Sequence, residues 1–190
     1  MAKKLSEMTD EERWHLFPII LEKPNPEWEN WFIEEKAHLE GIIPDEYIAR
    51  LSHIGSTSVG TIWAKPTVDI LIEIKDGISL SIIKDLILKS DEYYCMSEDE
   101  EWIAMNKGYT EQGFADKVYH IHLHHVGNNN ELYFRDYLID HPEAAKEYET
   151  LKLGIWKQYK YNRDKYTKAK TEVVRKYTEL SKKAYPGRYA

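Results

Sequence analysis

The residues most suited to chemistry lie in one short stretch of this 190-residue chain, residues 53–74, which reads HIGSTSVGTIWAKPTVDILIEI. A Gly-Ser pair, Gly55 and Ser56, follows an apolar segment, and Asp69 stands fourteen positions after Gly55, at the start of a second one. Glycine lets a backbone approach a phosphate closely, and a serine hydroxyl and a helix N-terminus donate hydrogen bonds to it. A carboxylate is a preferred ligand of Mg²⁺. The spacing therefore favours a phosphate at one end of the loop and a cation at the other.

The glycines of this stretch fit neither of two common nucleotide-binding motifs. The P-loop pattern G-x-x-x-x-G-K-[ST] matches Gly55 and Gly60, but Thr61 stands where the phosphate-binding lysine is needed and Ile62 where the hydroxyl is needed. The G-x-G-x-x-G pattern of dinucleotide-binding folds is absent from the sequence. A tight turn followed by a capped strand end, without any ligand, remains the structural alternative.

Four of the eight histidines lie between residues 120 and 125, within the segment VYHIHLHHV. A strand here would alternate its side chains between two faces. The apolar face would carry Tyr119, Ile121 and Leu123, and the other face would carry His120, His122 and His124. Imidazole binds transition metals and titrates near pH ~6.5, so these histidines are predicted to hold a cation with Asp69 or, when protonated, to bind phosphate. The alternative is a structural or solvent-facing role, and histidines spread along one strand cannot by themselves close a tetrahedral zinc site.

Basic side chains are candidates for gripping phosphate. Lys65 precedes the Asp69 segment, and Arg135 carries a guanidinium, which can bind phosphate through two parallel hydrogen bonds. Most of the other basic residues after residue 135 are interleaved with glutamate and are expected to form a solvated helix face. Lys152 and Lys170 are exceptions, because both fall at positions of a family signature that the chain resembles.

The elements that must position these residues follow from periodicity and from helix and turn signals. Strands are predicted at residues 47–54, 68–74, 93–96, 102–106 and 118–126, with a turn within 108–113. Helices are predicted at residues 5–21, from 27 to about 41, at 79–89, and over most of the chain from 131, with new helices opening at Pro142 and near Asn162. This alternation predicts an α/β (α+β) fold, a short mixed sheet flanked by helices with a helical C-terminal extension. We expect one domain over residues 1–190, with an N-terminal extension at 1–22 and the helical part at 131–185.

Composition limits the classes of function. Hydrophobic residues make up 42% and charged residues 31% of the chain, as in ordinary globular proteins. The net charge of −7 argues against broad binding to nucleic acid or to an anionic membrane. Cys95 is the only cysteine, no apolar run is long enough to span a bilayer, and the N-terminal segment lacks the apolar core of a signal peptide. A cytoplasmic location is therefore expected.

The stretch from His53 to Asp69 resembles the signature of the GrpB family, which belongs to the nucleotidyltransferase superfamily. The matching motifs are HIGSTSV, Ala64-Lys65-Pro66 and Asp69-Ile70, and further matches are PNPEW at 24–28, HIHLHHV at 120–126, FRDYL at 134–138, His141-Pro142, Tyr148, Tyr166 and Lys170. The resemblance covers roughly residues 18–183. It implies a nucleotidyltransferase-like fold in which Gly55, Ser56, Thr57 and Ser58 bind the phosphates of a nucleotide and Asp69 binds Mg²⁺.

Two positions depart from the pattern that the resemblance implies. Gly60 directly follows Val59, where a proline is usual, and Leu71 stands where an active nucleotidyltransferase has its second carboxylate. Residues two apart on a strand share a face about 6.6 Å apart, which suits a shared metal. Glu73 is on the same face but about 13 Å from Asp69, so it is a poor substitute.

The leading hypothesis is an enzyme that transfers a nucleotidyl or phosphoryl group from a nucleoside triphosphate to a small acceptor. Phosphate contacts are predicted for the loop residues 55–58, for Lys65 and for Arg135. Mg²⁺ or another divalent cation is predicted at Asp69 and His122, with Asp69, His120 and His122 as the catalytic set. The alternative is a non-catalytic binder of a nucleotide or phosphorylated metabolite that has lost the second carboxylate. In either case the partner is a small molecule; the oligomeric state and the identities of nucleotide and acceptor are not indicated by the sequence.

Overall fold

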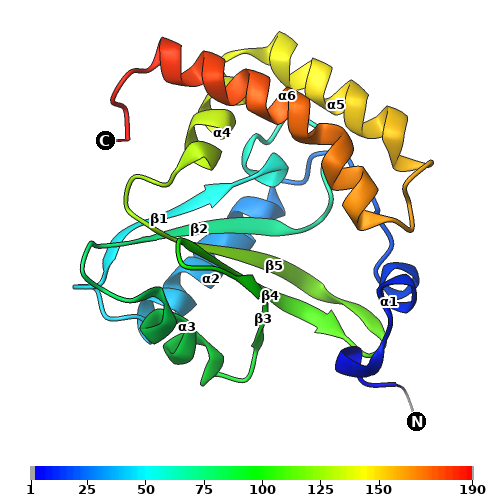
Figure 1. The fold of residues 1–190 in the computed structure, drawn as a ribbon. Helices are drawn as coiled ribbons and strands as arrows, with labels where there is room; N and C mark the ends of the chain where they lie inside the picture. Colours follow the sequence, from blue (N-terminus) through cyan, green and yellow to red (C-terminus); the bar gives the residue numbers. More distant parts are fainter. Residues whose placement is uncertain (1–2, 190) are drawn as a thin grey trace.

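The computed structural model describes residues 3–189 (Figure 1). The extreme ends of the predicted domain, residues 1–2 and 190, lie outside the described part. In chain order the elements are η1 (Leu5–Glu7), α1 (Asp10–Leu16), α2 (Glu27–Ile42), β1 (Ile48–Ile54), η2 (Ser56–Ser58), β2 (Val68–Ile74), α3 (Leu80–Leu88), β3 (Tyr93–Glu98), β4 (Trp102–Thr110), β5 (Gly113–His125), α4 (Asn130–Asp140), α5 (Pro142–Trp156) and α6 (Arg163–Ala184).

The five strands form one mixed sheet in the order β1-β2-β5-β4-β3. Strands β2 and β5 are parallel, whereas the other three pairs are antiparallel. The parallel pair lies in the inner part of the sheet, and β2 is an almost continuous aliphatic run, as expected of a strand covered on both faces. The predicted mixed sheet flanked by helices is confirmed.

One face of the sheet packs against α2 and α3 (Figure 1). Helix α3 contributes Leu80, Ile83 and Ile87, which lie on one side of the helix because they are spaced by three and four residues. The sheet contributes alternate residues of β2 and β5, among them Ile72 and Ile121, both fully buried. Each such side chain contributes about 1.5–3 kcal/mol of transfer free energy. The apolar face of β5 therefore points toward the helices, as predicted.

Helices α4, α5 and α6 form a second layer beyond the opposite face of the sheet (Figure 1). Their core joins Phe134 and Tyr148 to Val59 and Ile62, which lie in the segment between β1 and β2. Pro142 occupies the first turn of α5, and the side chain of Asn162 accepts a hydrogen bond from the backbone of Lys165 at the start of α6. Both predicted helix starts are confirmed. This layer brings the C-terminal third of the chain over the Gly-Ser loop.

The predicted helix at residues 5–21 is wrong in its extent. Helix α1 ends at Leu16 because Pro18 lacks an N–H and disfavours helical backbone at the residue before it. The chain then runs extended, with hydrogen bonds from Ile19 to Lys160 and between Glu22 and Ala64. Strand β5 also begins earlier than predicted, at Gly113. Among the described helices, none combines the length and the apolar character needed to cross a membrane.

Candidate functional site

The parallel register of β2 and β5 brings the predicted carboxylate and histidines together. Asp69 pairs with His120, and Leu71 pairs with His122. Nδ1 of His120 lies 3.0 Å from Oδ1 of Asp69, and Nε2 of His122 lies 3.7 Å from the same oxygen. The side chain of Asp69 remains one quarter exposed and that of His122 one third exposed, so the pair faces a solvent-accessible space. An imidazole from the neighbouring strand thus lies beside the position where the second carboxylate is absent.

His120 is held in one tautomer by its two partners. An ionised Asp69 only accepts hydrogen bonds, so Nδ1 of His120 donates to it. Nε2 is then the acceptor for the hydroxyl of Tyr109, at 2.8 Å. Burial, and then the positive charge of Lys65, lower the pKa of His120. Although burial alone would raise the pKa of Asp69, the hydrogen bond from His120 and the nearby imidazole of His122 outweigh that effect and hold this pKa well below its usual range. His120 is therefore neutral and positions an ionised Asp69.

His122 differs from His120 in its charge environment. Burial lowers its pKa, but the interaction with Asp69 and the negative charge of Glu131 outweigh burial and raise the pKa above the ordinary value of 6.5. The two neighbouring carboxylates therefore favour a proton on this imidazole. The pKa values of these two histidines, on the same strand face, are thus shifted in opposite directions: down for His120 and up for His122.

The Gly-Ser loop is shaped by Asp69. Gly55 has a φ of 72°, and a Cβ at this position would lie 2.3 Å from Oδ2 of Asp69. Only glycine fits both the left-handed backbone and this contact. Thr57 is buried and donates to the carbonyl of Thr67, and Ser58 donates to the carbonyl of Gly55. Ser56 and Thr57 line the cavity beside Asp69, whereas Gly55 and Ser58 support the loop.

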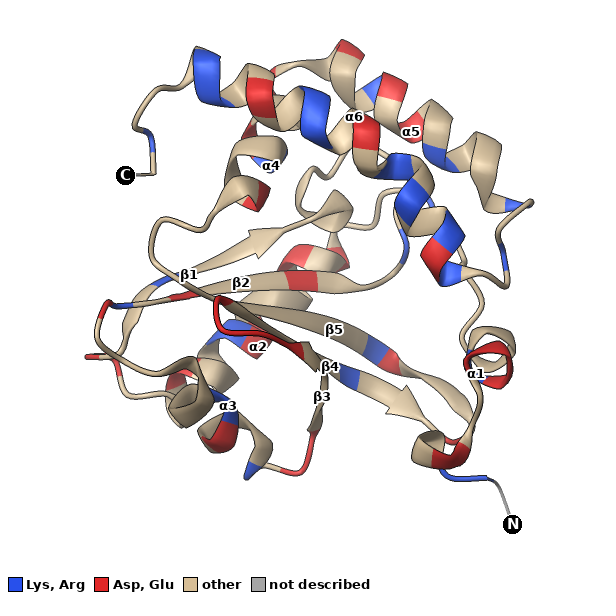
Figure 2. Ribbon diagram, viewed as in Figure 1, with Lys and Arg blue, Asp and Glu red and all other residues tan. Residues whose placement is uncertain are grey.

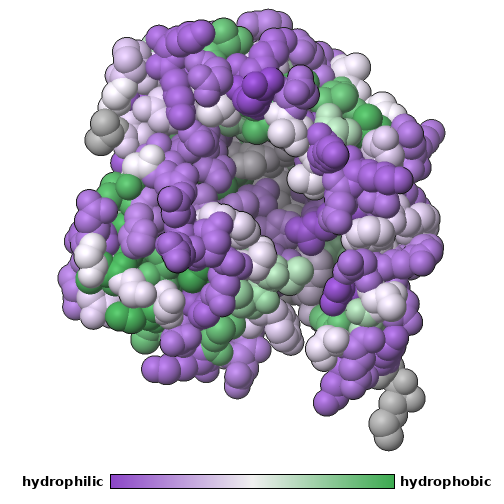
Figure 3. Space-filling model, viewed as in Figure 1, coloured by the Kyte–Doolittle hydropathy of each residue, from purple (hydrophilic) through white to green (hydrophobic). Residues whose placement is uncertain are grey.

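A cavity of about 270 Å³ lies between this loop, the sheet and α6. Figure 3 shows the molecule hollowed between the sheet and the layer formed by α4 to α6, and Figure 2 shows basic positions along the first half of α6. The basic residues that line the cavity are Lys65, Lys152, Arg163 and Lys170. Within residues 3–189, none of these four forms an ion pair. Asp69 is the carboxylate in their midst, so the cavity carries an excess of positive charge.

Two of these lysines have lowered pKa values, and one of them, Lys152, is deeply buried. Nζ of Lys152 donates to Oγ of Ser56 at 3.0 Å and to the carbonyl of Trp63, and only 2% of this residue is exposed. Burial, and then the charge of Lys170, lower the pKa of Lys152 to about 7. Burial, and then the charge of Arg163, lower the pKa of Lys65 to about 7. Neither ammonium group forms an ion pair with a carboxylate of residues 3–189. An anion bound in the cavity would supply the missing negative charge.

Arg135 does not join this group, in contrast to the prediction. Its guanidinium donates to Asp136, to the carbonyl of His53 and to the hydroxyl of Tyr189. These contacts tie α4 to the end of β1 and to the C-terminal segment. The guanidinium is therefore engaged in structural contacts, and we do not retain Arg135 as a phosphate ligand.

The region beyond Asp69 on β2 offers no second acidic ligand. Leu71 is fully buried in a cluster with Ile54 and Leu132. Glu73 is also fully buried, and one of its oxygens accepts hydrogen bonds from Gly127 and Asn129. The carboxylate of Glu73 is thus hydrogen-bonded to the segment after β5 and, as predicted, does not replace the missing acid.

Sequence reasoning missed two residues of this region. Arg163 was assigned to the solvated helix face, but it starts α6 and shares one side of that helix with Tyr166, Thr167 and Lys170. Glu131, in the first turn of α4, lies next to His122 and His124. The three-to-four spacing of Arg163, Thr167 and Lys170 marks one helix face, but no local signal says that this face covers a cavity.

The fold defines a class of protein. A structure of the Cid1 poly(U) polymerase with MgGTP bound superposes with a TM-score of 0.51 at 14% identity, covering 70% of this chain and 42% of that one. At this identity the likeness concerns the fold alone. The chain thus has a nucleotidyltransferase-like fold, with the Gly-Ser loop after β1 and Asp69 on β2.

The chain belongs to the GrpB family, whose model, described as GrpB protein, matches residues 18–180. It is 35% identical over 183 residues to UPF0157 protein YqkA of Bacillus subtilis (92% of this chain), and it spans about half, 51%, of that protein's length. It is 31% identical over 163 residues to glutamate-rich protein GrpB of Alkalihalophilus pseudofirmus (82% of this chain, 91% of that protein). The crystal structure of conserved protein GrpB from Enterococcus faecalis superposes with a TM-score of 0.65 at 27% identity, covering 83% of this chain and 99% of that one. The resemblance inferred from the sequence motifs is confirmed.

Proposed function

We propose that this protein binds the polyphosphate of a nucleoside triphosphate in the cationic cavity and transfers a nucleotidyl or phosphoryl group to a small acceptor. One observation carries the proposal: four basic side chains without ion-pair partners among the described residues, one of them deeply buried, surround Ser56 and Asp69. Keeping unpaired cations in a low-dielectric site is costly unless a ligand of opposite charge is bound there. A chain of phosphates carries several negative charges and matches this arrangement.

The roles of the residues follow from their positions. Lys65, Lys152, Arg163 and Lys170 would bind phosphate oxygens, and the hydroxyl of Ser56 would donate a further hydrogen bond. Asp69 and His122 would face the reacting phosphorus, and His120 would keep Asp69 oriented and ionised. The acceptor would enter from an adjoining cavity of about 320 Å³, which is lined in part by α1 and shares Lys65, His120, His122 and Arg163 with the first.

The residues at Asp69 do not fit a resident Mg²⁺. This ion takes six oxygen ligands and is usually held by one or two carboxylates together with substrate phosphates. Here Leu71 supplies no ligand, Oδ1 of Asp69 already accepts from His120, and the nearest further side chains are imidazoles instead of oxygen ligands. We therefore derive no step through Mg²⁺ and assign phosphate charge neutralisation to the four basic side chains.

A second function is favoured by Leu71. A buried leucine removes one of the two acids on which transfer chemistry of this fold depends, so the same cavity would serve a non-catalytic binder of a nucleotide or phosphorylated metabolite. This alternative shares the cationic cavity and predicts tight binding without turnover.

Calorimetry with matched variants of α6 tests the binding proposal. Lys170 lines the cavity, whereas Lys168, on the same helix, is exposed. We expect Lys170→Gln to weaken ATP or GTP binding by about 10- to 100-fold, because a charge-assisted contact contributes about 1.5–3 kcal/mol, and Lys168→Gln to change it less than twofold. Equal effects of the two variants, or no binding of any of the four nucleoside triphosphates by the unsubstituted protein, would contradict the proposal.

Turnover separates the two candidate functions. Release of pyrophosphate or of a nucleoside diphosphate in the presence of candidate acceptors, lost in Asp69→Asn with nucleotide binding retained, would support transfer. Binding without any such product, unchanged by Asp69→Asn, would leave the non-catalytic binder.

A further inference from the structure

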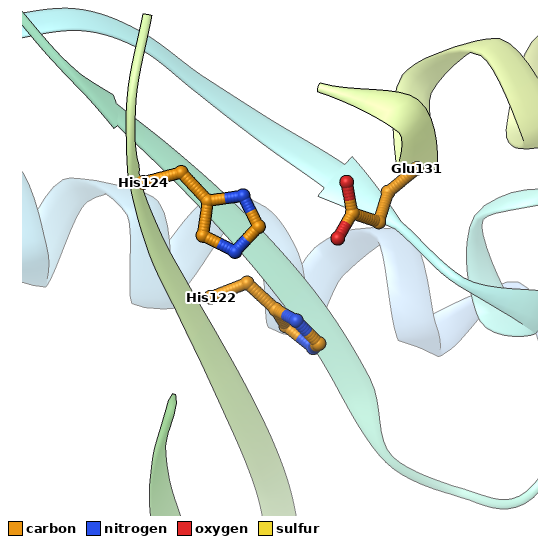
Figure 4. Close-up of side chains that lie close together, drawn as sticks. All are labelled: His122, His124 and Glu131. Carbon is orange, nitrogen blue, oxygen red and sulfur yellow. The ribbon is translucent and has the colours of Figure 1, made fainter. Parts of the chain in front are cut away.

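Three metal-ligating side chains meet beside the cationic cavity, and only His122 is shared with the proposed nucleotide site. His122 and His124 come from β5 and Glu131 comes from the first turn of α4, and Figure 4 shows the three side chains directed toward one another. One ligand atom from each lies within 4.8 Å of the other two. Two atoms bound to one ion lie at most about 4.2 Å apart, given bonds of about 2.1 Å. Side-chain shifts of under ~1 Å would therefore close the group around an ion.

Glu131 contributes an oxygen without a partner. Oε2 of Glu131 is buried and has no hydrogen-bond donor within residues 3–189. Buried polar atoms are nearly always paired, and an exception points to a bound water or ion. The carboxylate of Glu131 is directed toward the two imidazoles (Figure 4), so its unpartnered oxygen is a second indication of a ligand at this point.

His124 is already arranged as a metal ligand. Its Nδ1 lies 2.9 Å from the carbonyl oxygen of Asn128, which can only accept, so Nδ1 carries the proton. In the neutral imidazole Nε2 then presents its lone pair. A ligating histidine typically donates its other ring N–H to a backbone carbonyl or carboxylate, which fixes the tautomer and the ring orientation. With 7% of the residue exposed, His124 is also held rigidly by its surroundings.

We propose that His122, His124 and Glu131 hold a divalent transition-metal ion such as Zn²⁺, Mn²⁺ or Fe²⁺, with open coordination positions. Two imidazoles and one carboxylate are the donor set of open transition-metal sites, whereas Mg²⁺ and Ca²⁺ prefer oxygen ligands. Asp69 is not a member of this group. The site stands on its own geometry, so the inference goes beyond the proposed nucleotide transfer and does not depend on it.

Metal titration of the full chain without nucleotide tests the inference. Protein freed of metal by a chelator and dialysed would be titrated with Zn²⁺ by calorimetry and with Co²⁺ by visible absorption. We expect one ion per chain, an intense Co²⁺ absorption typical of nitrogen and oxygen ligands at low coordination number, and at least tenfold weaker binding of Mg²⁺. The isosteric Glu131→Gln should weaken Zn²⁺ binding at least tenfold and abolish the rise in melting temperature that the ion gives the unsubstituted protein.

One variant controls for other sites. His125→Gln alters a neighbouring histidine that contacts the carbonyl of Ile78 and is outside the group, and it should bind Zn²⁺ within threefold of the unsubstituted protein. The inference is overturned if that protein binds no ion at 100-fold excess, if Glu131→Gln binds Zn²⁺ as well as the unsubstituted protein does, or if His125→Gln loses as much affinity as Glu131→Gln. Circular dichroism verifies folding, and His122→Gln, at a partly exposed position, replaces Glu131→Gln if that variant does not fold. Since no nucleotide is present, failure here leaves the Lys170→Gln test of the nucleotide proposal unaffected.

Discussion

The buried charge of Lys152 should make the free protein less stable, because an ammonium group loses its hydration there. Lys152 is 2% exposed, its hydrogen bonds go to neutral acceptors on Ser56 and Trp63, and burial lowers its pKa from 10.5 to about 7. Lys152→Met keeps the approximate length of the side chain and removes the charge. If the cationic cavity is built for an anionic ligand, this substitution should stabilise the free protein and weaken ligand binding.

The magnitude follows from proton linkage. Below pH 7, Lys152 is protonated in both the folded and the unfolded state, and the difference between 10.5 and about 7 corresponds to a cost of about 5 kcal/mol in the folded state. Between pH 7 and 10.5 the unfolded state binds more protons, so stability rises with pH and about 2 kcal/mol of the cost remains at pH 9. The substitution removes this cost but leaves two acceptors without a donor, which costs about 1–2 kcal/mol.

We therefore expect Lys152→Met to raise the free energy of unfolding by about 3 kcal/mol at pH 6 and to leave it nearly unchanged at pH 9. Chemical denaturation at both pH values measures the difference, and calorimetry should show at least tenfold weaker nucleotide binding. Lys168→Met, at an exposed position of α6, is the control and should stay within about 0.5 kcal/mol. A Lys152→Met variant that is destabilised equally at both pH values would refute the reasoning, because Lys152 would then not carry an uncompensated charge.

Three further outcomes are expected from the same geometry. Nucleoside triphosphate affinity should fall between pH 7.5 and 9, by up to about tenfold per pH unit for each of Lys65 and Lys152 that must take up a proton, because both have a pKa of about 7; calorimetry in buffers of different ionisation enthalpy would detect the proton uptake, and its absence would contradict the linkage. Gly55→Ala should cost about 2–4 kcal/mol in denaturant unfolding because its Cβ meets Asp69, whereas Gly60→Ala, with the same φ of 72° and nothing within 4 Å, should cost about 1 kcal/mol. Leu71→Asp should lower the free energy of unfolding by more than about 3 kcal/mol and should create no Mg²⁺ site, because Leu71 is fully buried. The control Leu71→Val should lower it by less than about 1.5 kcal/mol in the same assay. A stable Leu71→Asp protein with new Mg²⁺ affinity would contradict this expectation.

The sequence predicted those features that depend on local chemistry. Alternation along residues 118–126 placed the histidines on one face and the apolar residues on the other, because successive side chains of a strand point to opposite sides. Aliphatic runs, caps and prolines located the strands and most helix starts. The error at residues 5–21 was also local, because Pro18 was present in the sequence and ends the helix.

The composition of the site depends on contacts between distant segments, which only the tertiary structure determines. The parallel register of β2 and β5 sets Asp69 beside His120, although the two residues are 51 positions apart. Packing of α6 over the Gly-Ser loop turns Arg163 and Lys170 into cavity residues, and packing of α4 directs Glu131 to the histidines while it turns Arg135 away. A helix has a solvent side and a buried side, and its periodicity identifies the two sides but not the partner. The sequence by itself therefore determined the strand, the loop and the family, whereas the positive cavity and the group formed by two histidines and a glutamate arise from how the layers pack.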